Sequence, residues 1–552
     1  MILPDKREKL IPWAVKISED CRNSAAARAA RCSELKSWLY TGSPDGNISI
    51  LNRMGHHVDR LASYIFSPRN LRFQMDFTHT YDKSILEKAA AAARAITKTW
   101  RHRDIDLQFS MGTFIALAYG ACIPKLMYTN TGLNCRLVMP WSFGVYQENR
   151  ENFEDQEALN ETTFLNPSEL WRRISRMPGA ADLYKRAIAY AKKNSTTTGP
   201  DTQAHQVLIA GSPPVVQTDP PYTQQPGGLV NVLTGPAMAQ VAPDIISELI
   251  QVHELWVRND ETEDWTTIQI AEPDILIWPR ENQHENLFVP DVLPYGLIRP
   301  NDMPGLFWGR SEMDDLMKLQ HLLRDRLEDV KKLMSLQYDR RYAFIGHSGM
   351  TDEAYDAMLE AGYFSVEAGA DVKDLTPELP KEWSADIDHI MKMMDEVAGF
   401  QNILSGQGEQ GVRAGVHAQT LIRTASPRLR DRALIVERNC ADLADKSFQA
   451  LAAKEAKAYW GEKNDEFLLS QLPDDYEVLV DSHSSSPIYE EDHLQLVSFL
   501  AKAGAVDAES LLDLFPMPMT DIIRARLKEK QAQQQKLIQE HPELLTKGGK
   551  KH

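Results

Sequence analysis

The sequence lacks any long hydrophobic run. Its longest nearly apolar stretch, residues 114–123, has about half of the ~20 residues that a membrane-spanning helix needs. Charged side chains at residues 5–9 stand where a secretory signal peptide would place its apolar region. The sequence therefore predicts a protein that is neither secreted nor inserted in a membrane.

Cysteine is also scarce, with five in 552 residues and no CxxC pair among them. An odd number of cysteines cannot all pair within one chain. Proteins that fold in the cytoplasm keep their thiols reduced. We therefore expect reduced, buried thiols and no disulfide framework.

The common signatures of enzymes are missing, since the sequence contains no HExxH, no Walker lysine motif and no GxSxG elbow. Two clusters offer residue types that suit a metal: His56-His57 with residues 102–106, and the His, Glu and Asp side chains of residues 483–493. Solvated charged surfaces explain both clusters more simply. We expect no enzyme, metal or cofactor, and a metal-dependent nuclease remains the enzymatic alternative.

Net positive charge is absent as well. A formal charge of −17 argues against a protein that holds nucleic acid by general attraction. One basic stretch stands out locally, with six arginines at positions 413, 423, 428, 430, 432 and 438. It is either a phosphate-contacting surface or a solvated helix face with salt bridges along it.

The first hundred residues are predicted to be mainly helical. Aromatic and β-branched residues favour strands at 111–119 and 137–146, and a helix is expected from 168 to 193 behind the capping residue Asn166. Residues 195–243 contain eight prolines and five glycines, which predict an irregular excursion. Short apolar runs then predict an antiparallel meander at 249–257, 266–271 and 275–278.

Two long helices are predicted next. Apolar residues in 311–338 are separated by 3, 4, 4, 3 and 4 positions, a narrow stripe that packs helix against helix. A second helix is expected at 384–405. Between them, residues 339–381 predict a small α/β module with strands at 342–345 and 363–366 and a helix that begins near Thr351.

A glycine loop follows the second helix, and a helix predicted to run to residue 460 comes after it, with a kink or restart at Pro427. The loop fits the GxGxxG pattern of dinucleotide-binding proteins. That pattern requires a strand before it, and here a helix precedes it. We therefore expect a connection between helices and no nucleotide site.

The order of these features resembles the portal (head-to-tail connector) proteins of tailed bacteriophages. The likeness rests on PYGLI at 294–298, FWGRSE at 307–312 with the leucine-rich helix behind it, LVMP at 137–140 and PSELW at 167–171. It extends over roughly residues 50–530. It implies an α+β, predominantly helical subunit with wing, helical stem, α/β clip and helical crown, which assembles into a ring.

The resemblance implies the following boundaries: wing 1–308, stem helix 309–338, clip 339–383, stem helix 384–405, tunnel loop 406–417, long kinked helix 418–460, wing return 461–495, and crown with C-terminal tail 496–552. It implies a ring, generally of twelve subunits, at one capsid vertex, through which double-stranded DNA is packaged, retained and ejected. Implied partners are the large terminase, the major capsid and scaffolding proteins, and a head-completion or adaptor protein. The location would be the virion, and the host cytoplasm during assembly.

The glycine loop would then line the narrowest part of the channel, because glycines let a short segment change shape as DNA advances. The residues expected to form it are Gly406, Gln407, Gly408, Glu409, Gln410, Gly411, Val412 and Arg413. Arg423, Arg428 and Arg430 are the expected phosphate contacts. A helical scaffold protein that never touches DNA is the remaining alternative.

Overall fold

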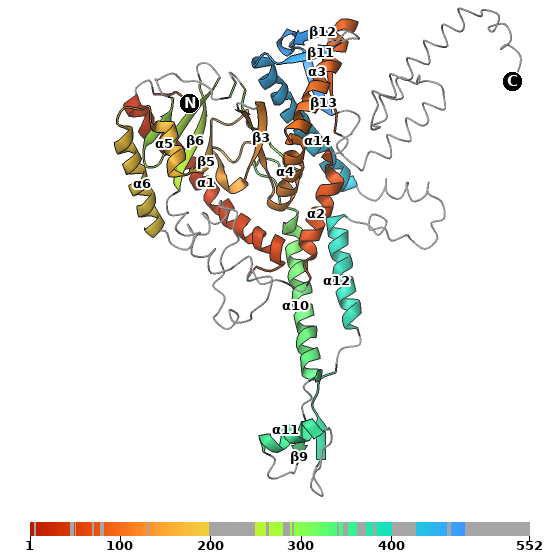
Figure 1. The fold of residues 1–552 in the computed structure, drawn as a ribbon. Helices are drawn as coiled ribbons and strands as arrows, with labels where there is room; N and C mark the ends of the chain where they lie inside the picture. Colours follow the sequence, from red (N-terminus) through yellow and green to blue (C-terminus); the bar gives the residue numbers. More distant parts are fainter. Residues whose placement is uncertain are drawn as a thin grey trace, which may run out of the picture.

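The computed structural model describes residues 1–4, 7–44, 49, 51–68, 71–77, 82–129, 132–197, 249–260, 264–279, 288–289, 292–338, 342–345, 351–361, 371–378, 382–399, 427–460 and 465–480. It has a broad body, two helices that project from the body side by side, and a small module at their far end (Figure 1). Helices and strands are mixed throughout. No helix in these ranges combines the length and the hydropathy that crossing a bilayer requires.

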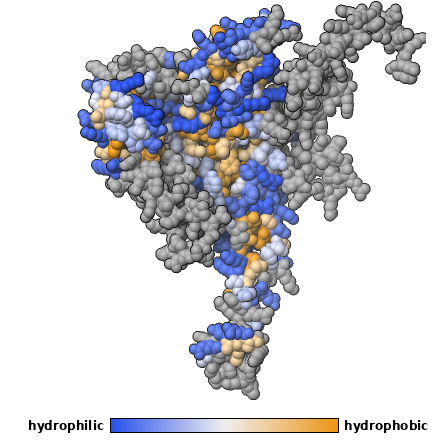
Figure 2. Space-filling model, viewed as in Figure 1, coloured by the Kyte–Doolittle hydropathy of each residue, from blue (hydrophilic) through white to orange (hydrophobic). Residues whose placement is uncertain are grey.

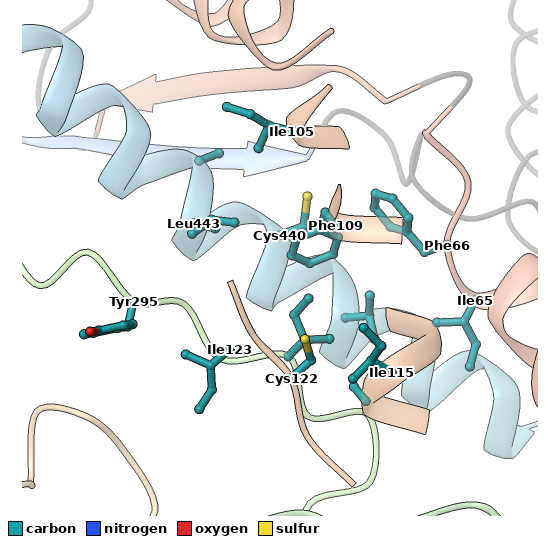
Figure 3. Packing of buried hydrophobic residues seen from close by; sticks show 14 of the residues in the cluster. Ile65, Phe66, Ile105, Phe109, Ile115, Cys122, Ile123, Tyr295, Cys440 and Leu443 are labelled. Carbon is teal, nitrogen blue, oxygen red and sulfur yellow. The ribbon is translucent and has the colours of Figure 1, made fainter. Parts of the chain in front are cut away.

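The largest apolar core lies among helices of the body: α2 (Arg53–Ile65), α3 (Lys83–His102), α4 (Ile105–Tyr119) and α14 (Pro427–Ala453). Figure 3 shows Cys440 and Leu443 of α14 among Phe109, Ile115 and Cys122. The apolar stripe of α14, from Leu429 to Leu443, is fully buried there, and the helix predicted from residue 428 is confirmed. The mainly helical character predicted for the first hundred residues is also confirmed.

Helix α4 corrects the strand predicted at 111–119. Buried residues lie on all sides of its second half, from Gly112 to Ala118, whereas Leu107 and Met111 in its first half are exposed. A helical segment with apolar residues on all sides shows no 3.6-residue alternation of apolar and polar positions, so its sequence resembles that of a buried strand. The hairpin strands of this region lie just beyond it, at β2 (Ile123–Thr129) and β3 (Gly132–Val138).

A five-stranded antiparallel sheet forms the other side of the body, in the order β4-β5-β6-β7-β8. Its strands are β4 (Phe143–Val145), β5 (Ala158–Leu165), β6 (Ile250–Arg258), β7 (Trp265–Ala271) and β8 (Ile275–Trp278). The predicted meander is confirmed as β6 to β8. The long helix α1 (Arg7–Thr41) packs against one face of the sheet through Leu10, Ala14 and Ile17.

Two helices cover the opposite face of the sheet, α5 (Pro167–Ile174) and α6 (Ala180–Thr197). A capping box of Asn166 and Glu169 opens α5, at the start that the sequence predicted. The single helix predicted over 168–193 is wrong, because the chain turns between the two at Gly179, whose φ is +73°. Helix α5 ends at Ile174, and Gly179 stands directly before α6 with a backbone angle that glycine adopts without steric cost.

Just before the first projecting helix, the backbone at Gly309 packs closely against the backbone at Gly120 and Asn301. A Cβ atom on Gly309 would lie 2.5 Å from the carbonyl oxygen of Gly120 and 2.7 Å from that of Asn301. Glu312 N then donates to Leu117 O at 2.9 Å. Glycine in the FWGRSE motif is therefore required by the packing of this segment against the end of α4.

The two projecting helices are α10 (Met313–Tyr338) and α12 (Trp383–Ala398), which we call the stalk. Both predicted helices are confirmed in kind, with two corrections at their ends. The first begins at Met313, and α12 stops at Gly399 (φ +79°), before the predicted end at residue 405. Residues 400–405 lie outside the described ranges.

The module at the end of the stalk contains β9 (Tyr342–Ile345), α11 (Asp352–Ala361) and β10 (Asp371–Asp374). Strand β9 and helix α11 confirm the prediction. The strand that pairs antiparallel with β9 is β10, whereas the strand predicted at 363–366 falls on residues outside the described ranges. One strand-helix-strand unit is thus carried far from the body (Figure 1).

Helix α14 ends at Ala453, so the prediction of helix to residue 460 is wrong. The chain continues through β11 (Lys457–Trp460), β12 (Asp465–Leu468), a short 3-10 turn η4 (Leu469–Gln471) and β13 (Tyr476–Val480). Strand β13 pairs antiparallel with β1 (Phe73–Phe77), which returns the chain to the body. The described helix starts at Pro427, in agreement with the predicted restart, and the proposed crown lies outside the described residues.

Candidate assembly site

Most of the predicted channel residues lie outside the described part of the chain. This holds for all eight residues of 406–413 and for Arg423. Of the Pro-rich segment predicted at 195–243, residues 198–243 also lie outside the described ranges. Arg428 and Arg430 lie in the first turn of α14, where Arg430 is half-buried. The phosphate-contacting role of these arginines remains a prediction.

One arginine of the basic stretch has a structural role. Arg432 is 3% exposed, and its guanidinium pairs with Glu312, which is also 3% exposed. Asn301 Nδ2 donates to Glu312 Oε1 at 2.8 Å. This buried ion pair joins α14 to the segment that leads into α10 of the stalk. The Arg432 side chain is therefore not exposed to contact DNA.

An apolar seam runs along the stalk. Leu316 and Leu323 of α10 are fully buried, as are Ile390 and Met394 of α12. Farther from the body the same stripe of α10 becomes accessible, and Met334 is 47% exposed. Figure 2 shows hydrophobic side chains at the surface of the stalk between hydrophilic ones.

A polar anchor holds the base of the stalk to the body. The Arg53 guanidinium on α2 contacts both oxygens of Asp395 on α12, at 3.0 and 3.2 Å. Gln320 of α10 donates from Nε2 to Leu51 O at 2.8 Å. Its Oε1 accepts a hydrogen bond from the backbone amide of Arg53 at 3.2 Å. One stretch around the start of α2 thus contacts both stalk helices, and this fixes where the stalk leaves the body.

His57 lies in the same anchor, with Nε2 3.5 Å from Asp395 Oδ1 and the side chain 2% exposed. Burial, together with the nearby Arg53 and Arg60, lowers the pKa of His57 to about 4. The imidazole is therefore neutral at pH 7. The anchor contains a group that resists protonation in the folded state.

The body also contains a buried cluster of charges between the β2-β3 hairpin and the sheet. Lys125 Nζ donates to Glu161 Oε2 at 2.6 Å and to Glu254 Oε1 at 2.5 Å, and the Tyr295 hydroxyl donates to Glu161 Oε2 at 2.8 Å. Arg136 also pairs with Glu161. Two cations and two carboxylates balance one another within this cluster.

Two buried carboxylates beside a lysine and a tyrosine could act as an acid-base site, but the pKa shifts of Glu254 and Tyr295 oppose proton transfer. Burial would raise the pKa of Glu254, whereas Lys125 and hydrogen bonds from Trp256 and Gln269 bring it below its usual value. Burial raises the pKa of the Tyr295 hydroxyl well above its usual value. Glu254 is held ionised and Tyr295 protonated, so these groups join the hairpin to the sheet rather than exchange protons.

The residues of the nuclease alternative do not converge on a metal site. His57 faces Asp395, while Asp106 accepts from the Leu107 amide at 2.9 Å on another helix. Within the described ranges no group of three or more His, Cys, Asp or Glu side chains is arranged to hold a metal ion. The second cluster, at 483–493, lies outside those ranges.

The five cysteines are free thiols in the structure. Burial raises the pKa of Cys21 and of Cys32 to about 12. Cys122 and Cys440 are fully buried, and Cys135 is intermediate. Thiols with raised pKa values are poor nucleophiles, and these cysteines act as small apolar residues of the core.

No family model matches the sequence, and no curated protein matches it. Among solved structures, the chain is similar to a chain from the virion of a native gene transfer agent (GTA) particle, at 10% identity and a TM-score of 0.39, over 88% of this chain and 93% of that chain. A chain from the neck of an empty GTA particle, computed with C6 symmetry, matches with the same identity and TM-score over 88% of this chain and 94% of that one. A TM-score of 0.39 does not establish a shared fold, so neither match assigns a function.

Proposed function

We propose that this chain is the subunit of a phage portal, a ring-shaped channel at one capsid vertex. In this role it is a structural protein of the virion and not an enzyme. Rings assemble in the host cytoplasm from about twelve copies, and double-stranded DNA passes through the channel during packaging and ejection. The sequence resemblance carried by residues 294–298 and 307–312 supports this assignment.

The uncovered seam of the stalk is the observation that carries the proposal. Its apolar stripe continues past the part that the body and α12 bury, to Met334 at 47% exposed. Narrow apolar stripes on charged helices need a partner. In a closed cyclic ring the neighbouring copy covers the stripe of every subunit, and no open edge is left over.

The charge of the chain suits a conduit. Twelve copies with −17 each carry roughly −200 charges, which opposes tight adhesion of DNA. The glycine loop at 406–413 would form the constriction, with Arg413, Arg423, Arg428 and Arg430 as local phosphate contacts. A channel of this kind guides the duplex without trapping it.

The parts of the subunit then take portal roles. The helices α10 and α12 form the stem, and the module with β9, α11 and β10 forms the clip, which would meet the large terminase and later the adaptor or head-completion protein. The body would form the wing. Wing and crown would face the major capsid and scaffolding proteins.

Native mass measurement of the purified full chain tests the assignment. One copy has a mass of 62.5 kDa, so a twelve-copy ring has about 750 kDa. A pair of substitutions on the seam, Val330→Asn with Met334→Asn, is expected to reduce the ring fraction strongly because both side chains would lose apolar contact with the neighbouring copy.

The matched control is Lys331→Asn with Ser335→Asn, since both residues are exposed on the same turns of α10 but off the stripe. This control is expected to assemble as the parent does. A parent protein that stays monomeric at high concentration would contradict the proposal. Equal loss of assembly in both pairs would show that the seam is not the contact.

A further inference from the structure

Helices α5 and α6 and the turn between them are strongly basic in an otherwise acidic chain. Residues 167–197 contain seven basic side chains against only Glu169 and Asp182, while the whole chain has a net charge of −17. All seven are exposed: Arg172, Arg173, Arg176, Lys185, Arg186, Lys192 and Lys193. A formal charge of about +5 therefore lies on one surface, which we call the α5-α6 surface.

Packing fixes this surface in place. Leu170 and Ile174 of α5 and Ala187 of α6 are fully buried against the sheet. The rings of Trp171 and Tyr184 meet edge to face at 5.3 Å, which couples the two helices. The basic side chains lie on the sides of the helices away from the sheet, because the buried positions occupy the side toward it.

Several of these charges are not neutralised within the described residues. Arg186 pairs with Asp274, and Arg173 Nη1 donates to Gln269 Oε1 at 3.5 Å. Within the described ranges Arg172, Arg176 and Lys185 form no ion pair. The carboxylate of Glu169 accepts from the Asn166 amide at 3.3 Å in the capping box, so it is committed to the start of α5.

We propose that the α5-α6 surface binds the phosphate backbone of double-stranded nucleic acid on the outside of the body. Helix α6 has 18 residues and is ~27 Å long. A duplex segment of that length carries ~16 phosphate charges. Exposed arginines donate two parallel hydrogen bonds to a phosphate, a geometry that a lysine does not offer.

This surface is separate from the predicted channel. Figure 1 places α5 and α6 at the end of the body away from α12 and α14, whereas the predicted loop connects those two helices. An acidic face of a second copy is the competing partner. The nucleic acid is favoured because the centre of a protein interface is apolar, whereas here only Trp171, at 42% exposed, is both large and apolar among the exposed side chains.

Binding of the full chain to a short blunt DNA duplex, measured over a range of salt concentrations, tests the inference. The variant Arg172→Gln, Arg176→Gln, Lys185→Gln removes three unpaired charges. Each lost phosphate contact lowers the slope of log affinity against log salt by ~0.9, so the slope should fall by up to ~2.7. Between 50 and 200 mM salt the parent would then lose about 40-fold more affinity than the variant.

A control variant removes the same number of charges elsewhere, with Lys16→Gln, Arg94→Gln and Lys98→Gln, all exposed. It is expected to keep the parent slope, and circular dichroism checks that both variants fold. Equal slopes for the parent and the α5-α6 variant would overturn the inference. Loss of assembly with unchanged DNA binding would also overturn it, in favour of contact between copies. Native mass is read separately, so failure here leaves the ring proposal standing.

Discussion

The ion pair between Glu312 and Arg432 gives the sharpest test of how the stalk is joined to the body. Both side chains are almost completely buried, and Asn301 adds a hydrogen bond at 2.8 Å to the carboxylate. The substitution Glu312→Leu removes the carboxylate and leaves the Arg432 cation without its principal counterion. Because a buried charge without a counterion is costly, the free energy of unfolding should fall by about 3–5 kcal/mol.

The pair as a whole contributes much less than that figure. Replacing both partners of a buried ion pair by apolar residues of similar size is often neutral or stabilising. The double variant Glu312→Leu, Arg432→Met should therefore recover most of the stability that Glu312→Leu loses. The coupling energy is obtained from the parent, Glu312→Leu, Arg432→Met and the double variant. It is expected to be several kcal/mol, above the ~0.5–3 kcal/mol usual for residues in contact.

Urea unfolding followed by tryptophan fluorescence measures these differences. The control is Asp386→Leu, which breaks the exposed pair of Arg326 with Asp386, where both side chains are about half exposed. An exposed pair contributes ~0–1 kcal/mol. If Glu312→Leu costs no more than the control, or if the double variant is as unstable as the sum of the two single variants, the reasoning about this junction fails.

Three further predictions concern the stalk and its anchor. The folded state lowers the pKa of His57 from 6.5 to about 4, so the unfolded state binds the proton more readily. The free energy of unfolding should therefore fall by about 3 kcal/mol as the pH drops from 7 to 4. Urea unfolding at several pH values should show a weaker pH dependence for His57→Gln. Leu323→Ala should lower the free energy of unfolding by ~2–5 kcal/mol because the side chain is fully buried, whereas Met334→Ala should change that of the monomer by less than ~0.5 kcal/mol. Thermal melts of unassembled protein measure both; a larger loss for Met334→Ala than for Leu323→Ala would contradict the burial. Gly309→Ala should lower the melting temperature more than Gly179→Ala. At Gly309 a Cβ would overlap backbone oxygens, whereas at Gly179 it would meet open space and Ala would carry only the strain of the left-handed conformation, about 1–2 kcal/mol; equal shifts would contradict the close approach.

Local pattern was enough to predict several elements. The stripes of α10 and α14 repeat apolar positions with the period of a helix, and the meander β6 to β8 was predicted from short apolar runs of strand length. Helix α4 does not, because its second half, from Gly112 to Ala118, has buried residues on every side, and the segment 111–119 was therefore predicted as a strand. Gly179 precedes α6 and Gly399 ends α12, both in the left-handed region; the glycines were a signal in the sequence but were outweighed by the apolar spacing around them.

The buried charge cluster and the polar anchor of the stalk could not be predicted from one sequence. Lys125, Glu161 and Glu254 come from three strands and meet only because the hairpin packs on the sheet. A charged residue within each of the three strands was the available signal, but it does not say which charges pair. Arg53 and Asp395 are 342 residues apart and meet for the same reason. The basic character of α5 and α6, in contrast, can be read directly from the sequence.

Electron microscopy of the purified full chain tests the central claim most directly. The account predicts closed rings with a central hole, in which the stalks of neighbouring copies lie against one another through the seam that includes Val330 and Met334. It also predicts that Gly406 to Arg413 line the narrowest part of the hole. Particles without a hole, or a map that places these eight residues on the outer surface of the ring, would contradict it.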